Sequence, residues 1–308
     1  MIIFGGATAT GKTKAGVMLA KIANGEIISA DSMQVYKHMD IGTAKVKKED
    51  MDGIKHYMID IIEPTDSFSV AEYQKMAMEI INDIEARGKT PIVVGGTGLY
   101  INSLIYPLRF GETQGDKGLR DSLKNELQRY GKEYLYKKLQ RIDPQAAENI
   151  HMNNIKRVIR AIEVKLLSGK SICDTEDLCR EKKYYKMYAY TMDRAALYER
   201  INTRVDVMFK NGLVDEVERL IFEYKVTFNA QSMQAIGYKE FKHYYSGKID
   251  MDELIELIKK HSRNYAKRQY TWFKSYNDCN WIEKYRLDEQ KCHEIVKDYY
   301  ENKPKLEV

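Results

Sequence analysis

A short glycine-rich stretch near the start of the chain has the pattern of a phosphate-binding loop. Gly6–Thr13 reads GATATGKT, which fits G-x-x-x-x-G-K-[ST], and it stands between an apolar run and a helix-forming run. In such a loop, backbone N–H groups and a helix N-terminus hold two linked phosphates, a lysine adds a point charge and the next hydroxyl binds Mg²⁺. We therefore predict a diphosphate site with Lys12 as the cation and Thr13 as the Mg²⁺ ligand. The pattern suits the tail of a nucleotide such as ATP as well as a free-standing diphosphate ester.

Polar residues follow two further predicted strands. Asp31 and Ser32 come directly after the run EIISA, and Thr97 follows PIVVGG. The carboxyl ends of parallel strands meet at one edge of a sheet, so we expect these residues beside the phosphate loop. Asp31 could act there as a general base, or it could be a helix cap or an acid near Mg²⁺. Thr97 could contact a substrate or serve only as a turn residue.

The first hundred residues alternate between strand-forming and helix-forming runs. This alternation predicts an α/β fold, a P-loop NTPase-like parallel sheet covered by helices on both faces. The expected strands are Ile2–Phe4, Glu26–Ala30, Met58–Ile62 and Pro91–Val94, and the expected helices are Lys12–Ala23 and Val70–Arg87.

Helical segments rich in Lys, Arg, Gln and Tyr then interrupt this alternation. We expect residues 112–183 to form an inserted helical domain, and residues 1–111 and 184–308 to form the α/β catalytic core. The core resumes with a strand in YYKMYAYTMD and continues with long helices from about Arg194 to Phe222. We assign no role to the polar tail after Leu287.

The composition is that of an ordinary protein with a substantial core. The chain has 308 residues, 44% hydrophobic and 31% charged, and no apolar stretch approaches the roughly 18 residues of a membrane span. We expect a cytoplasmic, bacterial-type protein with no membrane partner, and a monomer by default. The four cysteines form no C-x-x-C pair and, with the six histidines, no zinc spacing, so we expect reduced structural thiols.

The net charge of +5 is mild, but one segment is strongly basic. Leu257–Asn277 contains no acidic residue, whereas a solvated helix face normally mixes charges of both signs. We therefore favour a surface for a polyanion such as RNA and keep a solvated face as the alternative. At helical spacing the basic residues that share one face are Lys260, Arg263, Lys267 and Lys274.

The residues considered so far leave the type of reaction open. The strand PIVV ends in glycines and a threonine without an acid, and the base-reading pattern [NT]-K-x-D of GTPases is absent, which weakens the case for a nucleotide hydrolase. Kinases of small molecules, however, place an acid where Asp31 stands. A nucleotide or nucleoside kinase therefore remains an alternative.

Five motifs, in their order and spacing, resemble those of the tRNA dimethylallyltransferase family, also called tRNA isopentenyltransferase. They are GATATGKT, ISADSMQVYKHMDIGTAK (Ile28–Lys45), VGGTGLY (Val94–Tyr100), QAIGYKE (Gln234–Glu240) and AKRQYTWFK (Ala266–Lys274). The resemblance runs from Ile2 to about Trp281 and is to the bacterial form of the family.

This resemblance implies a reaction and its partners. The dimethylallyl group of dimethylallyl diphosphate would pass to N6 of adenine 37, beside the anticodon of tRNA, and diphosphate would leave with the help of Mg²⁺. The phosphate loop would then hold the diphosphate of the donor and not a nucleotide, and the helical insertion would contact the anticodon stem-loop. The alternatives are prenylation of free adenine nucleotides, against which the basic insertion argues, and a P-loop kinase.

The resemblance also implies roles for individual residues. Asp31 would take the proton from N6, with Thr97 near the reacting amine and Lys12 on the leaving group. The donor would be bound by Gly6, Ala7, Thr8, Ala9, Thr10, Gly11, Lys12, Thr13 and Arg204. The tRNA would be bound by Asp31, Ser32, Met33, Gln34, Thr97, Arg120, Lys156, Arg157, Val158, Ile159 and Arg160, to which the basic helix face adds Arg263 and Lys267.

Overall fold

The structure, a computed structural model, describes residues 1–106, 116–173 and 183–304. It divides into two compact units, Met1–Ile105 with Lys183–Val308, and Tyr106–Lys182. The boundary expected at residues 111–112 lies outside the described residues. Within the described ranges, no helix is both long and apolar enough to cross a membrane.

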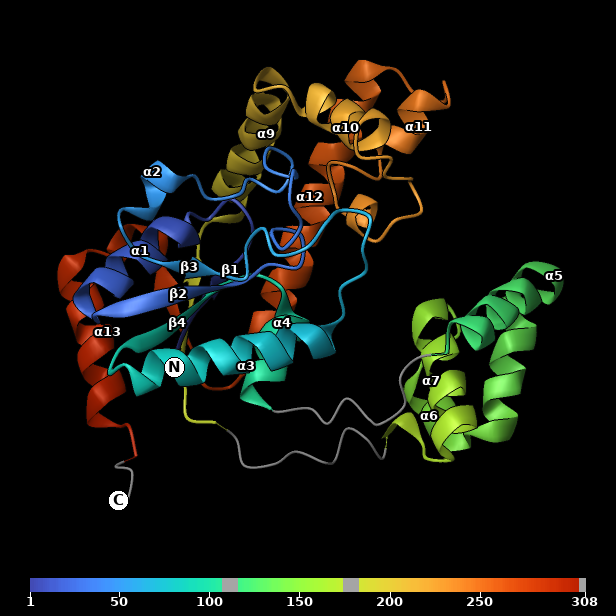
Figure 1. Ribbon diagram of the computed structural model, residues 1–308, viewed down its shortest axis with the longest axis horizontal. Helices are drawn as coiled ribbons and strands as arrows, with labels where there is room; N and C mark the ends of the chain where they lie inside the picture. Colours follow the sequence, from blue (N-terminus) through green and yellow to red (C-terminus); the bar gives the residue numbers. More distant parts are fainter. Residues whose placement is uncertain (107–115, 174–182, 305–308) are drawn as a thin grey trace. The chain divides into compact units, whose positions relative to one another are not determined.

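A six-stranded parallel sheet forms the centre of the first unit (Figure 1). Its strand order is β3-β2-β4-β1-β5-β6, so β1 lies between β4 and β5 and is buried along its whole length. The loop that follows β1 therefore begins at the middle of one sheet edge. The predicted α/β class with a parallel sheet is confirmed. The strands are β1 (Ile2–Gly6), β2 (Gly25–Ala30), β3 (His56–Tyr57), β4 (Thr90–Gly95), β5 (Lys186–Thr191) and β6 (Cys279–Glu283).

The strand predicted over Met58–Ile62 is wrong. The third strand ends at Tyr57, and beyond it only Ile62 forms an isolated bridge, with Tyr36. Met58 and Asp60 have φ values of 63° and 55°, which break an extended strand. The segment bends instead, and the N–H groups of Ile61 and Ile62 both donate to the carbonyl oxygen of Val35.

Helices cover both faces of the sheet. On one face, α1 (Lys12–Ile22) and α13 (Glu289–Glu301) pack together over the side chains of Ile2 and Phe4 (Figure 1). The polar tail to which we assigned no role thus contains α13, whose apolar side is buried in the core. On the other face lie α3 (Val70–Ala86), α4 (Gly98–Ile105) and α12 (Met251–Lys274).

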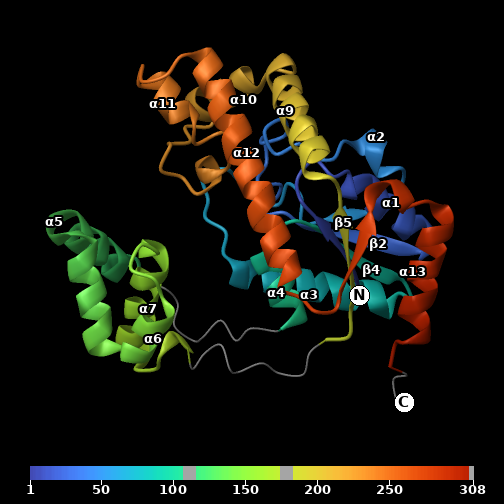
Figure 2. The same ribbon diagram turned by 180° about the vertical axis from the view of Figure 1, so that it is seen from behind.

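Two of these helices begin at strong N-terminal signals. Ser69 and Glu72 form a capping box at the start of α3, and Asp250 and Glu253 form another at the start of α12. Helix α9 (Arg194–Lys210) runs beside α12 (Figure 2). The remaining helices of this unit are α2 (Lys48–Met51), α10 (Leu213–Phe222) and α11 (Phe241–Tyr245).

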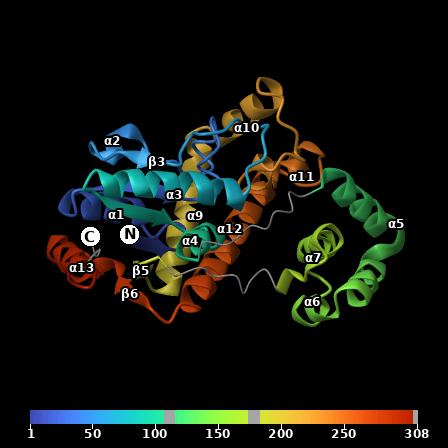
Figure 3. The ribbon, with the colours of Figure 1, turned by 60° about the horizontal axis from the view of Figure 1, so that its bottom comes forward.

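The second unit is helical. Its helices α5 (Lys117–Ile142), α6 (Pro144–Asn149) and α7 (Ile155–Ser168) pack around a small core of their own (Figure 3). Gly131, with φ 80°, interrupts α5 and lets its two halves fold back toward each other. The buried side chains at this core include Leu135, Leu139 and Val158.

Candidate active site

The phosphate loop joins β1 to α1 and is held mainly by its own backbone. Gly6, Ala9 and Gly11 have φ values of 143°, 63° and 89°, which turn successive amides of the loop toward its concave side. The buried hydroxyl of Thr10 donates a hydrogen bond to the carbonyl oxygen of Ala7 at 2.8 Å. Thr10, which we predicted to bind the donor, therefore uses its hydroxyl to shape the loop.

Basic side chains crowd around this loop. Arg200 of α9 donates its Nε to the carbonyl oxygen of Ala9 at 2.9 Å, and with Arg204 it lines an open pocket beside the loop. Burial lowers the pKa of Lys12 to about 8, an effect that the Asp31 carboxylate opposes and the Arg204 guanidinium strengthens. Burial also lowers the pKa of Arg204. Such crowding of cations is relieved when a polyanion lies among them.

The second group of predicted residues lies at the ends of β2 and β4, which are neighbouring strands. The N–H of Ser32 donates to Thr97 Oγ1 at 3.0 Å, and the N–H of Thr97 donates to the carbonyl oxygen of Ala30 at 3.0 Å. Asp31 Oδ1 accepts the N–H of Met33 at 2.9 Å. No hydrogen bond to Asp31 Oδ2 is found within the described residues, so this oxygen is available to a substrate.

A pocket of about 250 Å³ connects these two groups. Its polar lining includes Thr8 from the phosphate loop together with Asp31 and Arg204. Its apolar lining comes largely from α9 and α12, namely Ile201, Val205, Met208 and Ile258. A ligand with an anionic head and a small hydrocarbon group matches this combination.

Helix α12 lies very close to the turn that follows β4. A Cβ at Gly96 would lie 2.1 Å from Gln269 Nε2, and a Cβ at Gly98 would lie 2.3 Å from the ring of Trp272. A side chain at Gly96 would push Gln269 from its place, and one at Gly98 would clash with the Trp272 ring. This contact explains why the motifs VGGTGLY and AKRQYTWFK occur in one chain: the glycines of the first make room for the helix of the second.

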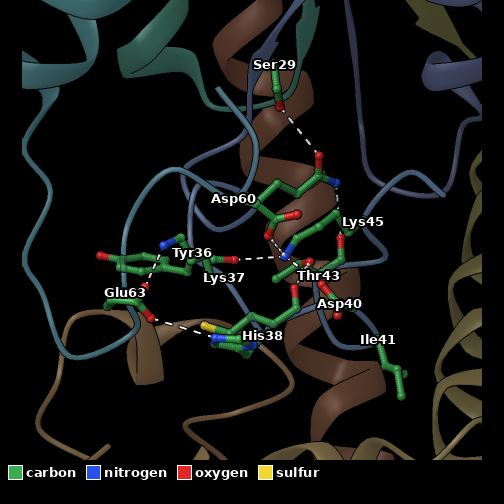
Figure 4. Close-up of polar contacts among 12 residues, drawn as sticks. Ser29, Tyr36, Lys37, His38, Asp40, Ile41, Thr43, Lys45, Asp60 and Glu63 are labelled. Carbon is green, nitrogen blue, oxygen red and sulfur yellow. Dashed lines mark hydrogen bonds and ion pairs between the residues drawn. The ribbon is translucent and has the colours of Figure 1, made fainter. Parts of the chain in front are cut away.

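The segment Tyr36–Lys45 forms part of the pocket wall and is held by side chains (Figure 4). Lys45, whose side chain is 6% exposed, donates to the carbonyl oxygen of Tyr36 at 2.8 Å and to Asp40 at 2.6 Å. It also forms an ion pair with Asp60. The Lys45 ammonium group thus links both ends of the segment through oxygen acceptors and holds the segment in a closed loop.

A buried carboxylate fixes the same segment from α10. Glu216 accepts the N–H groups of Asp40 at 2.8 Å, Ile41 at 2.7 Å and Gly42 at 3.1 Å. The hydroxyl of Tyr238 donates to it as well, at 2.6 Å. The motifs ISADSMQVYKHMDIGTAK and QAIGYKE, which are far apart in sequence, thus meet at one carboxylate that neither motif contains.

The amide of Gln34 is engaged inside this segment. Its Nε2 donates to the carbonyl oxygens of Thr43 at 3.3 Å and Ala44 at 3.4 Å. To donate to tRNA, the binding role expected for Gln34, the amide nitrogen would have to leave these carbonyls.

Comparison with known proteins decides between the reactions that the sequence left open. A family model described as IPP transferase matches residues 34–276. The tRNA dimethylallyltransferase of Thermoanaerobacter sp. is 51% identical over 304 residues, which cover 96% of this chain and 95% of the relative. The chain belongs to the tRNA dimethylallyltransferase family. It is accordingly a tRNA-modifying transferase that prenylates adenine.

Solved structures are similar to this chain over nearly its whole length. The crystal structure of the full-length tRNA isopentenylpyrophosphate transferase from Bacillus halodurans is 44% identical, has a TM-score of 0.73, and covers 97% of this chain and 95% of its own. A eukaryotic dimethylallyltransferase acting on tRNA is 28% identical with a TM-score of 0.85, covering 100% of this chain and 81% of its own. These relatives do not support the alternative that the protein is a P-loop kinase.

Two of the residues predicted to contact RNA in the helical unit, Arg120 and Arg160, pair with one buried acid. Arg120 Nε lies 2.8 Å and Arg160 NH1 2.7 Å from the carboxylate of Glu163, which is fully buried. Both guanidinium groups remain partly exposed and are held in place by Glu163. Lys156 and Arg157 are exposed, whereas Val158 is buried and Ile159 partly buried in the core of the unit.

The basic face predicted on α12 of the transferase is partly engaged with α9. Arg263 NH1, on that face, donates to Asn202 Oδ1 at 2.6 Å. Lys259, which was not assigned to the face, forms an ion pair with Asp206 at 2.8 Å. Lys267 is exposed and lines a groove with Arg194 and Lys274. The end of the face near β6 is therefore the more open part.

Three polar residues of the transferase site were missed by the sequence analysis. Gln269 stands within AKRQYTWFK, so its motif was a signal, but Glu216 and Lys284 belong to none of the five motifs. Lys284 follows β6, and its Cε would lie 3.7 Å from a Cβ at Gly11. Burial and the charge of Arg200 lower the pKa of Lys284.

Proposed function

We propose that this protein transfers the dimethylallyl group of dimethylallyl diphosphate to N6 of adenine 37 in tRNA, giving N6-(dimethylallyl)adenosine and diphosphate. The observation that carries the proposal is the single pocket lined by Thr8 of the phosphate loop, by Asp31 and by Arg204. An anion site and a carboxylate base opening on one small pocket are what prenyl transfer to an amine requires.

The donor's diphosphate is assigned to the phosphate loop, residues Gly6 to Thr13, and to Arg204. As the allylic C–O bond breaks, its electron pair moves to the diphosphate, and the loop amides, Lys12 and Arg204 stabilise the new charge. The apolar pocket wall takes the five-carbon group and keeps water away from the electron-poor carbon.

Thr13 is assigned as the protein ligand of Mg²⁺. Its hydroxyl is partly exposed at the N-terminus of α1, and within the described residues it has no hydrogen-bond partner, so the oxygen fits a metal ligand. Mg²⁺ typically takes one or two protein oxygens and completes its shell with phosphate oxygens and water. When bound, the metal would supply charge neutralisation to the leaving diphosphate.

Asp31 is assigned as the general base. A new C–N bond forms from the N6 lone pair while the N6–H proton passes to Oδ2, the carboxylate oxygen that no described residue occupies. The hydrogen bond of Met33 to Oδ1 orients the carboxylate. Thr97, held against Ser32, is assigned to the acceptor side of the pocket.

We assign tRNA-binding residues in each of the two units. In the first unit these are Asp31, Ser32, Met33, Gln34, Thr97, Arg263 and Lys267, and in the helical unit they are Arg120 and the segment Lys156–Arg160. The arginines held by Glu163 have the exposed, oriented guanidinium groups that bind phosphates. The cytoplasmic setting and the monomeric state expected from the sequence stay predictions.

The test is a labelling experiment. The protein would be incubated with Mg²⁺, radiolabelled dimethylallyl diphosphate and an unmodified tRNA with adenines at positions 36 to 38, beside AMP as a competing acceptor. We expect label in the tRNA at adenine 37, none in AMP, and a loss of about hundredfold or more in Asp31→Asn. Label in AMP would show instead that the protein prenylates free adenine nucleotides. Turnover of ATP with no label in either acceptor would favour the alternative of a P-loop kinase.

A further inference from the structure

One buried side chain connects the two halves of the active site. Gln269 of α12 accepts the N–H of Thr8 through Oε1 at 2.8 Å and donates from Nε2 to the carbonyl oxygen of Gly96 at 3.0 Å. The side chain is 5% exposed. A single amide group thus bridges the phosphate loop and the turn that carries Thr97.

The bridge depends on the chemistry of a carboxamide. A carboxamide offers an acceptor and a donor on one planar group, whereas a carboxylate only accepts and a hydrocarbon does neither. Gly96 is pressed so closely on Nε2 that no side chain fits between them. Neither backbone segment can move away without leaving a buried polar group unpaired, which is costly.

The same contact determines which loop amides remain for a ligand. The N–H of Thr8 is engaged with Gln269, so a diphosphate is left with the later amides of the loop, at the N-terminus of α1. Tyr265, one turn earlier on α12, lies near Thr97 and Gln269 and lines the pocket beside Asp31.

We propose that Gln269 is a positioning residue for prenyl transfer, which sets the separation between the leaving group on the phosphate loop and the acceptor amine beside Asp31 and Thr97. The reacting carbon must lie within reach of N6 as the C–O bond breaks, and a displacement of about 1 Å can cost about a hundredfold in rate. The inference rests on the proposed function, because it takes the loop as the donor site and the Asp31–Thr97 edge as the acceptor site.

Two substitutions cut the bridge in different ways. Gln269→Glu keeps the acceptor for Thr8 but loses the donor for Gly96, whereas Gln269→Met has a similar shape and loses both hydrogen bonds. For Gln269→Glu we expect a donor KM within about twofold of the wild type and a single-turnover rate lower by about tenfold or more. For Gln269→Met we expect a rate lower by about a hundredfold together with a raised donor KM.

A matched control is present in the same chain. Gln231 makes the same type of amide bridge to the backbone of Phe68, accepting its N–H at 3.2 Å and donating to its carbonyl oxygen at 2.7 Å. Neither residue lines the pocket. Gln231→Met should lower the thermal midpoint but leave the single-turnover rate per folded molecule within twofold of the wild type.

Each outcome has one meaning. If Gln269→Met, or Gln269→Glu should the former not fold, transfers as fast per folded molecule as the wild type, Gln269 is only a structural contact and the inference is overturned. If the rate falls but the donor KM is the same in the two variants, the idea that the two hydrogen bonds of Gln269 separately hold the phosphate loop and the turn at Gly96 is overturned. Failure of the proposed function would instead show in the wild type, as the absence of label at adenine 37.

Discussion

The phosphate loop and the segment Tyr36–Lys45 both line the active site, but they are held in opposite ways. The loop is shaped by its own backbone, with left-handed residues at Gly6, Ala9 and Gly11 and one internal hydroxyl bond. The segment depends on the distant carboxylates of Glu216 and Asp60. The comparison teaches that a loop shaped by its backbone and braced by Gln269 and Arg200 can leave Lys12 for chemistry. The segment Tyr36–Lys45, by contrast, needs its charged groups for its shape.

The largest effect on the transfer rate is predicted for a substitution of Lys12. Its only hydrogen bond within the described chain is a long one, 3.5 Å to the carbonyl oxygen of Ala7, so Lys12→Met should leave the fold intact. The transfer rate should fall about a thousandfold, because one charge on the leaving group is lost. Single-turnover assays with Lys14→Met, an exposed neighbour, as control would measure this. A fall of less than tenfold would mean that the loop does not hold the leaving group.

Glu216→Gln should give the next largest effect, on stability. The substitution removes charge from a buried group that accepts four hydrogen bonds, which should cost about 3 kcal/mol of unfolding free energy. Denaturant unfolding would measure the loss, with the exposed Glu223→Gln as the control. Donor affinity per folded molecule should stay within about twofold of the wild type. A loss of donor-binding free energy as large as the loss of unfolding free energy would show that the phosphate loop and the segment Tyr36–Lys45 are not held separately.

Donor affinity should depend on pH through Lys12. Its pKa is lowered to about 8 in the free protein, so the ammonium charge is present below that pH and is lost as the pH rises through it. Because the diphosphate binds the charged form, donor affinity should weaken by up to about tenfold per pH unit above 8, or about 1.4 kcal/mol. Titration calorimetry between pH 6.5 and 9.5 would test this, and the dependence should disappear in Lys12→Met.

The smallest effect is expected at Thr10. Thr10→Val keeps the shape of the side chain but removes the hydrogen bond to Ala7, which should cost about 1 kcal/mol of unfolding free energy. If Thr10 only shapes the loop, the donor KM should stay within about twofold. A tenfold rise in KM with little change in stability would return Thr10 to the binding role that the sequence suggested.

The same contrast explains what the sequence could predict. The phosphate loop and the pairing of Asp31 with Thr97 followed from local patterns and from the rule that parallel strands end at one sheet edge. Glu216 could not be found this way, since the backbone N–H groups that it accepts lie more than 170 residues away and an isolated acid on an amphipathic helix carries no signal. The strand expected over Met58–Ile62 failed because apolar content was read as a strand, while backbone turns at Met58 and Asp60 decided the conformation.

The position of β1 in the middle of the sheet has a consequence for synthesis of the chain. One neighbour, β4, spans Thr90–Gly95, but the other, β5, spans Lys186–Thr191, and the helix that braces the phosphate loop, α12, ends only at Lys274. The loop is synthesised before these elements, and it gains their contacts only when the chain has been made as far as Lys274. Contacts between such distant segments slow folding, because a long loop must close before they form. We therefore expect the nascent protein to become able to bind diphosphate late, in a single step that accompanies completion of the sheet.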